Sequence, residues 1–188
     1  FRSLAAELPD FGLATRGLLM LCREERTLAH EGALVRQARE LGVPAEVLDA
    51  AATARLDPGA RMSIAGSVYF PRDAHLDPGK LIGALTPRLR AAGVDFLWET
   101  EITGWRREGG RLAAALTHRG EIAADEFVLA GGAWSPPMVR GLGLRLPMQA
   151  GKGYSLTIPR PRQLPQLCSI LTEARVAVTP MDGSLRVG

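Results

Sequence analysis

The sequence has little cysteine and no long hydrophobic run. Its two cysteines, Cys22 and Cys168, are too few for a disulfide scaffold, and neither belongs to a Cys-x-x-Cys pair. Both lie in apolar, strand-like stretches, so we expect them to be buried and reduced. The longest apolar stretches, such as residues 17–22, are far shorter than the roughly 20 residues that cross a bilayer, and we expect no signal peptide.

The sequence also lacks an excess of one charge. Its 23 Lys and Arg residues are scattered among 20 Asp and Glu residues, which leaves a net charge of +3. We therefore expect no nucleic-acid partner. What the sequence does contain is a hydrophobic fraction of 46% in 188 residues. This fraction argues against intrinsic disorder and provides a core for one large domain or two small ones.

Helix signals mark four segments: residues 23–41, residues 49–57, residues 77–93 and a stretch that begins near 134. In the first, apolar residues follow a helical period up to a glycine stop. The third has the clearest signal, because Asp77 is a typical N-cap and Pro78 suits the first helical position. Pro87 is expected to kink or shorten that helix.

Apolar or alternating stretches between turn residues predict the strands. They cover residues 17–22, 67–70, 94–98, 102–106, 112–117, 121–124, 127–130, 154–158, 169–171, 176–179 and 185–187. Turns such as Gly109-Gly110 and Asp182-Gly183 favour an antiparallel meander. The expected fold class is therefore α+β. The abrupt start and end of the chain lead us to expect a piece of a longer protein.

Two glycine motifs resemble phosphate-binding loops but fail. Leu146 stands where a dinucleotide fingerprint starting at Gly141 needs its third glycine, and Gly153 stands where a Walker loop ending in Gly151-Lys152 needs Ser or Thr. The better candidate is Gly131-Gly132, which follows an apolar run and precedes a predicted helix. Its backbone N–H groups could approach an anionic ligand. The alternative is a tight turn without a ligand.

Catalytic side chains are scarce. His30, His75 and His118 lie far apart, and none forms a helical pair with another ligand residue, so no metal site is predicted. His75 lies in a loop between a predicted strand and a capped helix, where functional residues are common. The absence of a Gly-x-Ser-x-Gly motif disfavours a hydrolase triad.

Five motifs stand in order along the chain, at residues 69–78, 100–105, 129–135, 151–157 and 176–188. Together they resemble the interior of the FAD-dependent amine oxidoreductases, the superfamily of D-amino-acid oxidase, glycine oxidase and sarcosine oxidase. The stretch Lys-Gly-Tyr-Ser-Leu-Thr and the closing Leu-Arg-Val-Gly look most like the small subunit of bacterial D-amino-acid dehydrogenase.

This resemblance implies two domains. Residues 1–76 and 147–188 would form an antiparallel-sheet substrate domain, and residues 77–146 would be an inserted helix, strand and meander part of an FAD-binding domain. In the family, the strand matching Ile102 offers backbone groups to the adenine, and the turn matching 130–134 packs near the ribose and pyrophosphate. The implied cofactor-binding residues are Ile102, Ala130, Gly131, Gly132 and Trp134.

Three further residues are implied near the substrate or the flavin. Arg186 aligns with a position where sarcosine-oxidase-like members place a Lys beside the flavin, although an exposed strand Arg is the alternative. His75 and Tyr154 are the other two candidates. Ala177 replaces the Tyr that glycine and sarcosine oxidases use at the substrate, which favours the dehydrogenase branch.

The implied reaction is FAD-dependent oxidative deamination of a D-amino acid to a 2-oxo acid and ammonia. The chain alone is not expected to be active, and no catalytic residue is assigned. Implied partners are a small-molecule D-amino acid or related amine and a respiratory-chain electron acceptor. The implied location is the cytoplasm, with or without peripheral attachment to the inner membrane. Two alternatives stay open: another amine oxidase of the superfamily, of the glycine, sarcosine or proline type, or a non-catalytic binding module.

Overall fold

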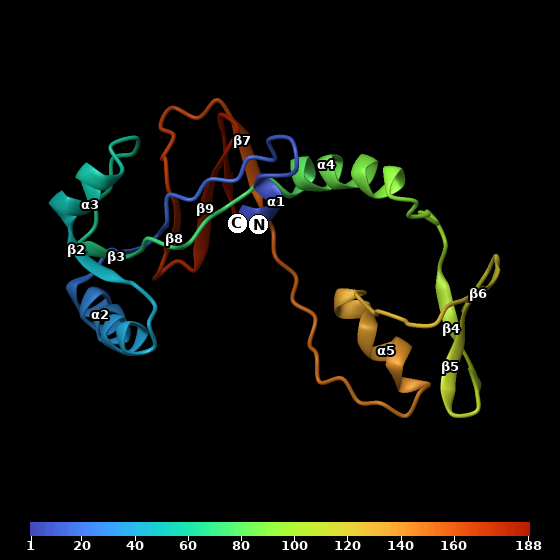
Figure 1. The fold of residues 1–188 in the computed structure, drawn as a ribbon. Coiled ribbons are helices and arrows are strands. Elements are labelled where there is room, and N and C mark those ends of the chain that lie inside the picture. Colours follow the sequence, from blue (N-terminus) through green and yellow to red (C-terminus); the bar gives the residue numbers. More distant parts are fainter. The chain divides into compact units, whose positions relative to one another are not determined.

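The computed structural model describes residues 1–188 and divides them into two compact units (Figure 1). Unit 1 consists of Phe1–Ala92 and Gly153–Gly188, and unit 2 consists of Gly93–Lys152. Both contain helices and strands, so the α+β class is confirmed. None of the helices combines the length and the apolar composition needed to cross a membrane.

Unit 1 is built on a seven-stranded sheet with the strand order β2-β3-β1-β8-β9-β10-β7. The strands are β1 (Leu18–Cys22), β2 (Glu46–Asp49), β3 (Gly66–Phe70), β7 (Leu156–Pro159), β8 (Cys168–Leu171), β9 (Val176–Met181) and β10 (Ser184–Val187). All neighbours are antiparallel except β1 and β8, which pair in parallel. The β9–β10 hairpin closes at Asp182 and Gly183, whose φ angles of 48° and 78° are those of a type I′ turn.

The helices of unit 1 are α1 (Arg2–Ala5), α2 (Glu25–Glu40), α3 (Ala50–Leu56) and α4 (Pro78–Ala91). The Asp49 side chain caps α3 by accepting a hydrogen bond from the Ala52 N–H at 2.6 Å. Pro87 lies inside α4 but does not shorten the helix, contrary to that part of the prediction. Its exposed ring removes one backbone hydrogen bond, and the residue one turn earlier is Gly83, whose missing side chain leaves room.

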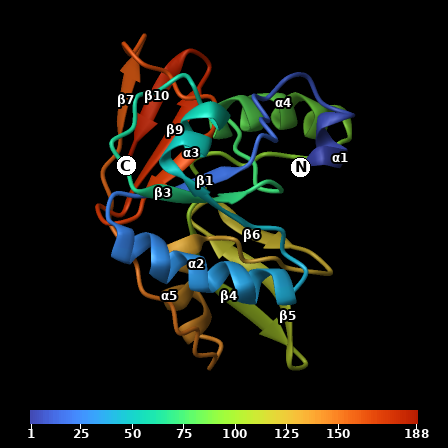
Figure 2. The same ribbon diagram turned by 90° about the vertical axis from the view of Figure 1, so that its left-hand side faces the viewer.

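The two faces of the unit 1 sheet carry different clusters, because side chains alternate along each strand. On one face Leu19 and Leu21 pack with Leu167. On the other face Val68 packs with Val35 of α2 and with Ala45. Figure 2 shows α2 running beside β3, in agreement with the contacts between these elements.

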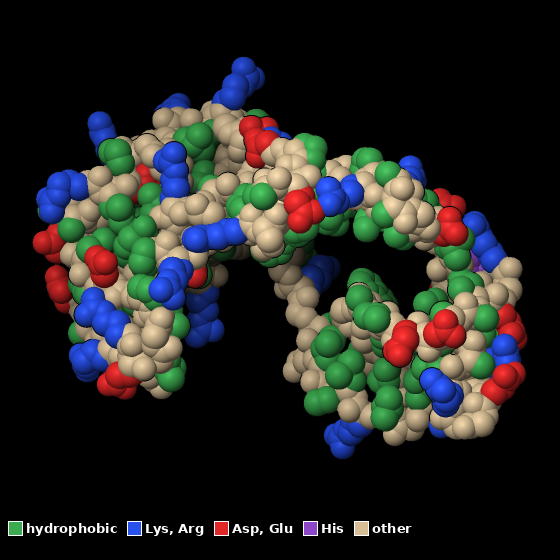
Figure 3. All heavy atoms as spheres, viewed as in Figure 1, with side chains coloured by type: hydrophobic (Ala, Val, Ile, Leu, Met, Phe, Trp, Pro, Cys, Tyr) green, Lys and Arg blue, Asp and Glu red, His purple; other side chains and the backbone are tan.

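Unit 2 contains a small antiparallel sheet of β4 (Ile102–Glu108), β5 (Arg111–Thr117) and β6 (Gly120–Ala123). A 3-10 turn, η1 (Gly132–Trp134), leads into α5 (Ser135–Arg140). The Trp105 side chain joins the two parts, since its Nε1–H donates to the Met138 carbonyl at 3.0 Å and its ring meets Phe127 edge-on at 5.6 Å. Figure 3 shows hydrophobic side chains gathered on the visible surface of this unit.

Two predicted strands of unit 2, residues 94–98 and 127–130, are not formed. A strand requires a neighbour that pairs with its backbone, and neither stretch has one within the unit. Val128 is 91% exposed as a result. The unit limits, after residues 92 and 152, also differ from the limits at 76 and 146 that the resemblance implied. Which part binds cofactor and which binds substrate remains a prediction.

Candidate functional site

His75 lies in a loop that is fixed on both sides by backbone hydrogen bonds. Its N–H and carbonyl pair with the carbonyl and N–H of Ala14 at 3.0 and 2.8 Å, as an isolated bridge between two loops. Two residues later, Asp77 caps α4 and accepts hydrogen bonds from the N–H groups of Gly79 and Lys80 at 2.8 and 3.1 Å. The loop is therefore held as a rigid connection between β3 and α4.

The imidazole of His75 is half-buried and has an unusual bonding pattern. Its Nδ1 is buried and has no hydrogen-bond partner. The ring also bonds to the backbone of Pro180, whose only available group is the carbonyl. Burial lowers the pKa of His75, and this hydrogen bond opposes the shift. Because Nδ1 is closed to solvent and has no partner, its burial carries a cost in stability.

Arg186 lies on β10, opposite Thr179 of β9 and Thr157 of β7. Its guanidinium donates a hydrogen bond to the Ser155 hydroxyl at 3.1 Å and forms no ion pair with a carboxylate. Arg186 and His75 line the same cavity of about 480 Å³. The other residues around this cavity come from both chain segments of unit 1. They include Leu13, Leu76, Thr179 and Met181. Because the Arg186 guanidinium has no ion-pair partner, this cavity is suited to an anionic or zwitterionic ligand.

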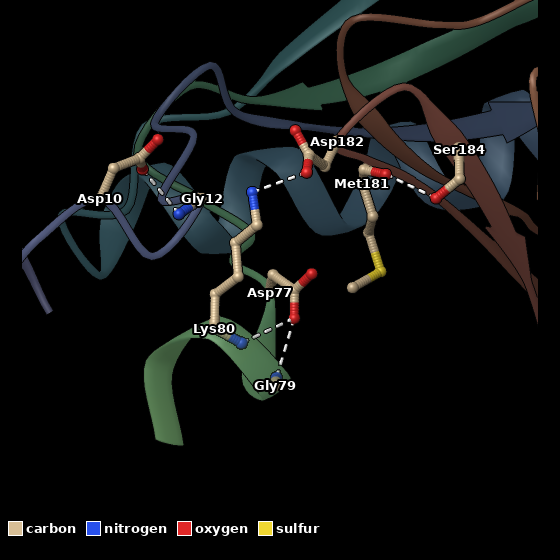
Figure 4. Close-up of polar contacts among 8 residues, drawn as sticks. All are labelled: Asp10, Gly12, Asp77, Gly79, Lys80, Met181, Asp182 and Ser184. Carbon is tan, nitrogen blue, oxygen red and sulfur yellow. Dashed lines mark hydrogen bonds and ion pairs between the residues drawn. The ribbon is translucent and has the colours of Figure 1, made fainter. Parts of the chain in front are cut away.

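The β9–β10 turn is tied to the start of α4 by one ion pair. Lys80 Nζ lies 2.7 Å from an oxygen of Asp182, and Figure 4 shows the Lys80 side chain reaching from α4 to this turn. The carboxylates of Asp182, Asp10 and Asp77 raise the pKa of Lys80, with the hydrogen bond to Asp182 as the largest cause. A second cavity of about 270 Å³ lies here, and His75 lines it as well.

Tyr154, the third residue expected near the substrate, does not line the cavity of His75 and Arg186. Its side chain is 82% exposed, and it precedes β7. Its expected role is untested and stays a prediction. Cys22 and Cys168 are both buried and unpaired as disulfides, and burial raises the pKa of each thiol.

The five cofactor-binding candidates all lie in unit 2. Ile102 begins β4, where it pairs with Thr117. Ala130, Gly131, Gly132 and Trp134 lie on the bend into η1 and α5, where the Trp134 N–H donates to the Gly131 carbonyl at 3.1 Å. Gly132 has a φ of 53°, which favours glycine, and Trp134 is 78% exposed. The bend is thus not covered by side chains of its own unit.

The sequence motifs did not identify Thr179 or Met181 as lining a site, and they did not predict that Lys80 pairs with Asp182. Thr179 could have been found, because it shares a sheet face with Arg186 once the hairpin register is set by Asp182-Gly183. The ion pair joins residues about a hundred positions apart, and no local pattern indicates it.

Comparison with known proteins identifies the family. The family model described as DAO, FAD dependent oxidoreductase, matches residues 1–188. The D-amino acid dehydrogenase of Rhizorhabdus wittichii is 36% identical over 180 residues, which cover 93% of this chain and 43% of that protein. The D-amino acid dehydrogenase of Agrobacterium fabrum is also 36% identical, over 95% of this chain and 44% of that protein. The chain therefore spans less than half the length of these relatives.

Solved structures agree with this assignment. Glycine oxidase from Geobacillus kaustophilus superposes with a TM-score of 0.88 and 25% identity, over 100% of this chain and 52% of that chain. L-proline dehydrogenase from P. horikoshii shares the fold, with a TM-score of 0.76 and 19% identity over 95% of this chain and 49% of that chain. On the sequence match along its whole length, the chain belongs to the DAO family of FAD-dependent oxidoreductases.

Proposed function

We propose that the protein containing this chain is an FAD-dependent D-amino-acid dehydrogenase, which converts D-amino acids to 2-oxo acids and ammonia. The similarity to D-amino acid dehydrogenases at about a third identity supports this substrate class. Because the chain spans about 43% of those relatives, the activity is proposed for a polypeptide of their length and not for residues 1–188 alone. The observation that carries the proposal is the cavity shared by His75 and Arg186.

The residues of unit 1 fit an amino-acid substrate, and those of unit 2 fit FAD. Each fit rests on residues of its own unit. In unit 1, the imidazole of His75 and the guanidinium of Arg186, which has no ion-pair partner, would serve a polar ligand beside the flavin ring. In unit 2, the open bend at 130–134 leaves Gly131 and Gly132 accessible to the ribose and pyrophosphate, and Ile102 would face the adenine. When bound, the flavin supplies the hydride acceptor for the α-carbon of the substrate.

Arg186 is proposed to bind the substrate carboxylate. A guanidinium donates two parallel hydrogen bonds to a carboxylate, and this pairing is strongest where no competing carboxylate is present. No carboxylate pairs with Arg186, and Ser155 occupies only one of its nitrogens. Ser155 would therefore orient the side chain while leaving donors for the ligand.

His75 is proposed to accept a hydrogen bond from the substrate amine. Its lowered pKa keeps the ring neutral near pH 7, so that one ring nitrogen is an acceptor. This acceptor would take a hydrogen bond from an ammonium or amine N–H, which requires the ring to turn if the acceptor is Nδ1, because Nδ1 is closed to solvent. The deprotonated amine is the form that loses a hydride, so an acceptor at this position would favour the reactive species.

The test is anaerobic reduction of the flavin in the full-length protein. D-alanine and other D-amino acids are expected to bleach the flavin absorbance, whereas the L-enantiomers, glycine, sarcosine and proline are expected to react far more slowly. Faster reduction by glycine, sarcosine or proline would replace this proposal with another amine oxidase of the family. A full-length protein that contains FAD but is reduced by none of these amines would contradict it.

The electron acceptor is proposed to be a component of the respiratory chain, with the enzyme in the cytoplasm or attached to the inner membrane surface. This rests on the resemblance to the dehydrogenase branch alone. The rate of reduction of a soluble quinone should exceed the rate of reaction with oxygen. The reaction with oxygen is measured as the hydrogen peroxide formed. Equal or faster turnover with oxygen would assign the protein to the oxidases.

A further inference from the structure

A third cavity of unit 1, of about 310 Å³ and here called the reverse-face cavity, lies on the sheet face opposite His75 and Arg186. Val178 and Leu185 line it, whereas their chain neighbours Thr179 and Arg186 line the candidate substrate cavity. Because successive side chains of a strand point to opposite faces, β9 and β10 separate the two cavities. The reverse-face cavity is therefore distinct from the candidate substrate site.

The wall of this reverse-face cavity is mainly apolar. It is formed by strand residues and by two loops that cross the face, with the main apolar side chains from Leu21, Met62, Ile64, Leu171, Val178 and Leu185. Hydrogen bonds connect the two loops, one around residue 61 and one around residue 163. The Arg61 N–H donates to the Gln163 side-chain oxygen at 2.8 Å. Asp57 forms a second connection, because its carboxylate accepts hydrogen bonds from the N–H groups of Gln166 and Leu167 at 3.0 Å. The opening is thus held by fixed structure and does not depend on a loose segment.

One charged residue lines this cavity. Arg61 is the only charged residue that lines the cavity, and its guanidinium forms no ion pair or hydrogen bond in the structure. A cation without a partner at the edge of an apolar cavity complements a ligand that has one negative charge and an apolar body. A cationic ligand would be repelled by Arg61, and a neutral polar ligand would gain less from it than an anion would.

We propose that the reverse-face cavity binds a medium-chain aliphatic carboxylate, with its carboxylate at Arg61 and its chain along β8, β9 and β10. The volume lies at the lower end of the range for ligand sites, about 300–1,000 Å³, which suits an acid of about eight carbons. The site takes part in no step of the deamination and does not depend on the proposed function. Its occupant is a free acid, and neither a second copy of the chain nor a membrane surface.

The test is isothermal titration of the full-length protein with butanoate, octanoate and octylammonium at one ionic strength. Octanoate should bind at least about 10-fold more tightly than butanoate, because each buried methylene adds roughly a factor of four until the cavity is full. Octylammonium has a similar chain and the opposite charge, and should bind at least about 5-fold more weakly than octanoate.

Three variants locate the bound acid. Arg61→Gln should weaken octanoate binding by about 3-fold or more, and the change is safe for folding because Arg61 is exposed. Arg36→Gln, on the exposed surface of α2, should leave the affinity unchanged and controls for net charge. Arg186→Gln should also leave it unchanged, since Arg186 faces the other cavity.

The proposal is overturned by any of four results. These are equal affinity for butanoate and octanoate, equal affinity for octylammonium, an unchanged affinity in Arg61→Gln, or a loss in Arg186→Gln as large as that in Arg61→Gln. Absence of octanoate binding overturns it as well, including the case in which another part of the longer polypeptide or a second copy fills the cavity. Flavin reduction by D-amino acids is unaffected by these outcomes, so the two proposals fail separately.

Discussion

Units 1 and 2 differ sharply in how they bury apolar side chains. All three clusters of buried hydrophobic residues lie in unit 1: two on its sheet, whose strands come from distant parts of the chain, and one between the N-terminal segment and α4. Unit 2 buries only Ala114, Ala115 and Ser135, although it contains large side chains such as Val128 and Trp134 that are mostly exposed. Unit 1 is therefore stabilised by its own core, whereas unit 2 has apolar surface that its own residues do not cover.

The largest expected effect tests how unit 1 is held together. Asp57 is 1% exposed and accepts hydrogen bonds from the backbone N–H groups of Gly59, Gln166 and Leu167. Asp57→Ala leaves these donors without an acceptor, and we expect the free energy of unfolding to fall by about 3 kcal/mol. Urea unfolding followed by circular dichroism measures this. Asp57→Asn keeps one acceptor oxygen and should lose clearly less, so similar losses in the two variants would contradict the explanation.

A smaller effect is expected at the corresponding connection in unit 2. Trp105→Phe removes the hydrogen bond to the Met138 carbonyl but keeps an aromatic ring against Phe127. We expect a loss of about 1 kcal/mol in the free energy of unfolding, because one partly buried bond is removed.

The matched control for this prediction is Trp98→Phe, an exposed position where the ring stacks on Phe96. This control should change the free energy of unfolding by less than about 0.5 kcal/mol. If the control lost as much as Trp105→Phe, the hydrogen bond to Met138 would not be what holds α5 to the small sheet.

The contrast between the units also explains which parts of the fold the sequence predicts. The strands of unit 1 other than β2, and the capped helices α3 and α4, follow from local periodicity, caps and turns. The parallel pairing of β1 with β8 does not, because it joins residues about 150 positions apart. The strand β2 was missed, since Glu46–Asp49 has two charged residues in four. In unit 2 the runs 94–98 and 127–130 have strand composition but no partner, and composition alone does not form a ladder.

The candidate site shows the same division. The resemblance pointed to His75 and Arg186, but only the paired strands and the bridge to Ala14 place them at one cavity. The orphaned Nδ1 of His75 has no sequence signal, because burial and bonding depend on tertiary contacts. Tyr154 was an expectation of the resemblance, and the structure does not bring it to this cavity.

The third prediction concerns the pH dependence of stability. Because burial lowers the pKa of His75, the unfolded chain binds this proton at a higher pH than the folded protein does. The stability contributed by neutral His75 is therefore present above the ordinary pKa of about 6.5 and is lost as the pH falls through the folded pKa. His75→Gln should make the free energy of unfolding less dependent on pH below about 6.5. The change in slope should correspond to less than one proton taken up on unfolding.

Urea unfolding at several pH values measures this slope, with the two proteins compared first at pH 8. The difference found there reflects the lost hydrogen bond to Pro180 and is subtracted. An unchanged slope in His75→Gln would show that His75 is not held neutral by burial, and would remove the basis for its proposed role as an acceptor.

The smallest effect is expected for the ion pair between Lys80 and Asp182. Both side chains are exposed, so water competes with the pair, and Lys80→Met should lower the thermal midpoint only slightly. The difference should disappear in about 1 M salt, where the Debye length falls to about 3 Å. A loss that persists at high salt would indicate that packing of the Lys80 stem matters more than its charge.

The same variant tests what positions Arg186. Strand β10 is hydrogen-bonded to β9 on one side and to β7 on the other, so two ladders fix its register. One exposed ion pair at the turn adds little to these ladders. We therefore expect Lys80→Met to leave the KM for a D-amino acid unchanged in the full-length enzyme, whereas Arg186→Gln raises it. A KM raised equally by both variants would mean that the turn, rather than the ladder, holds Arg186 at the cavity.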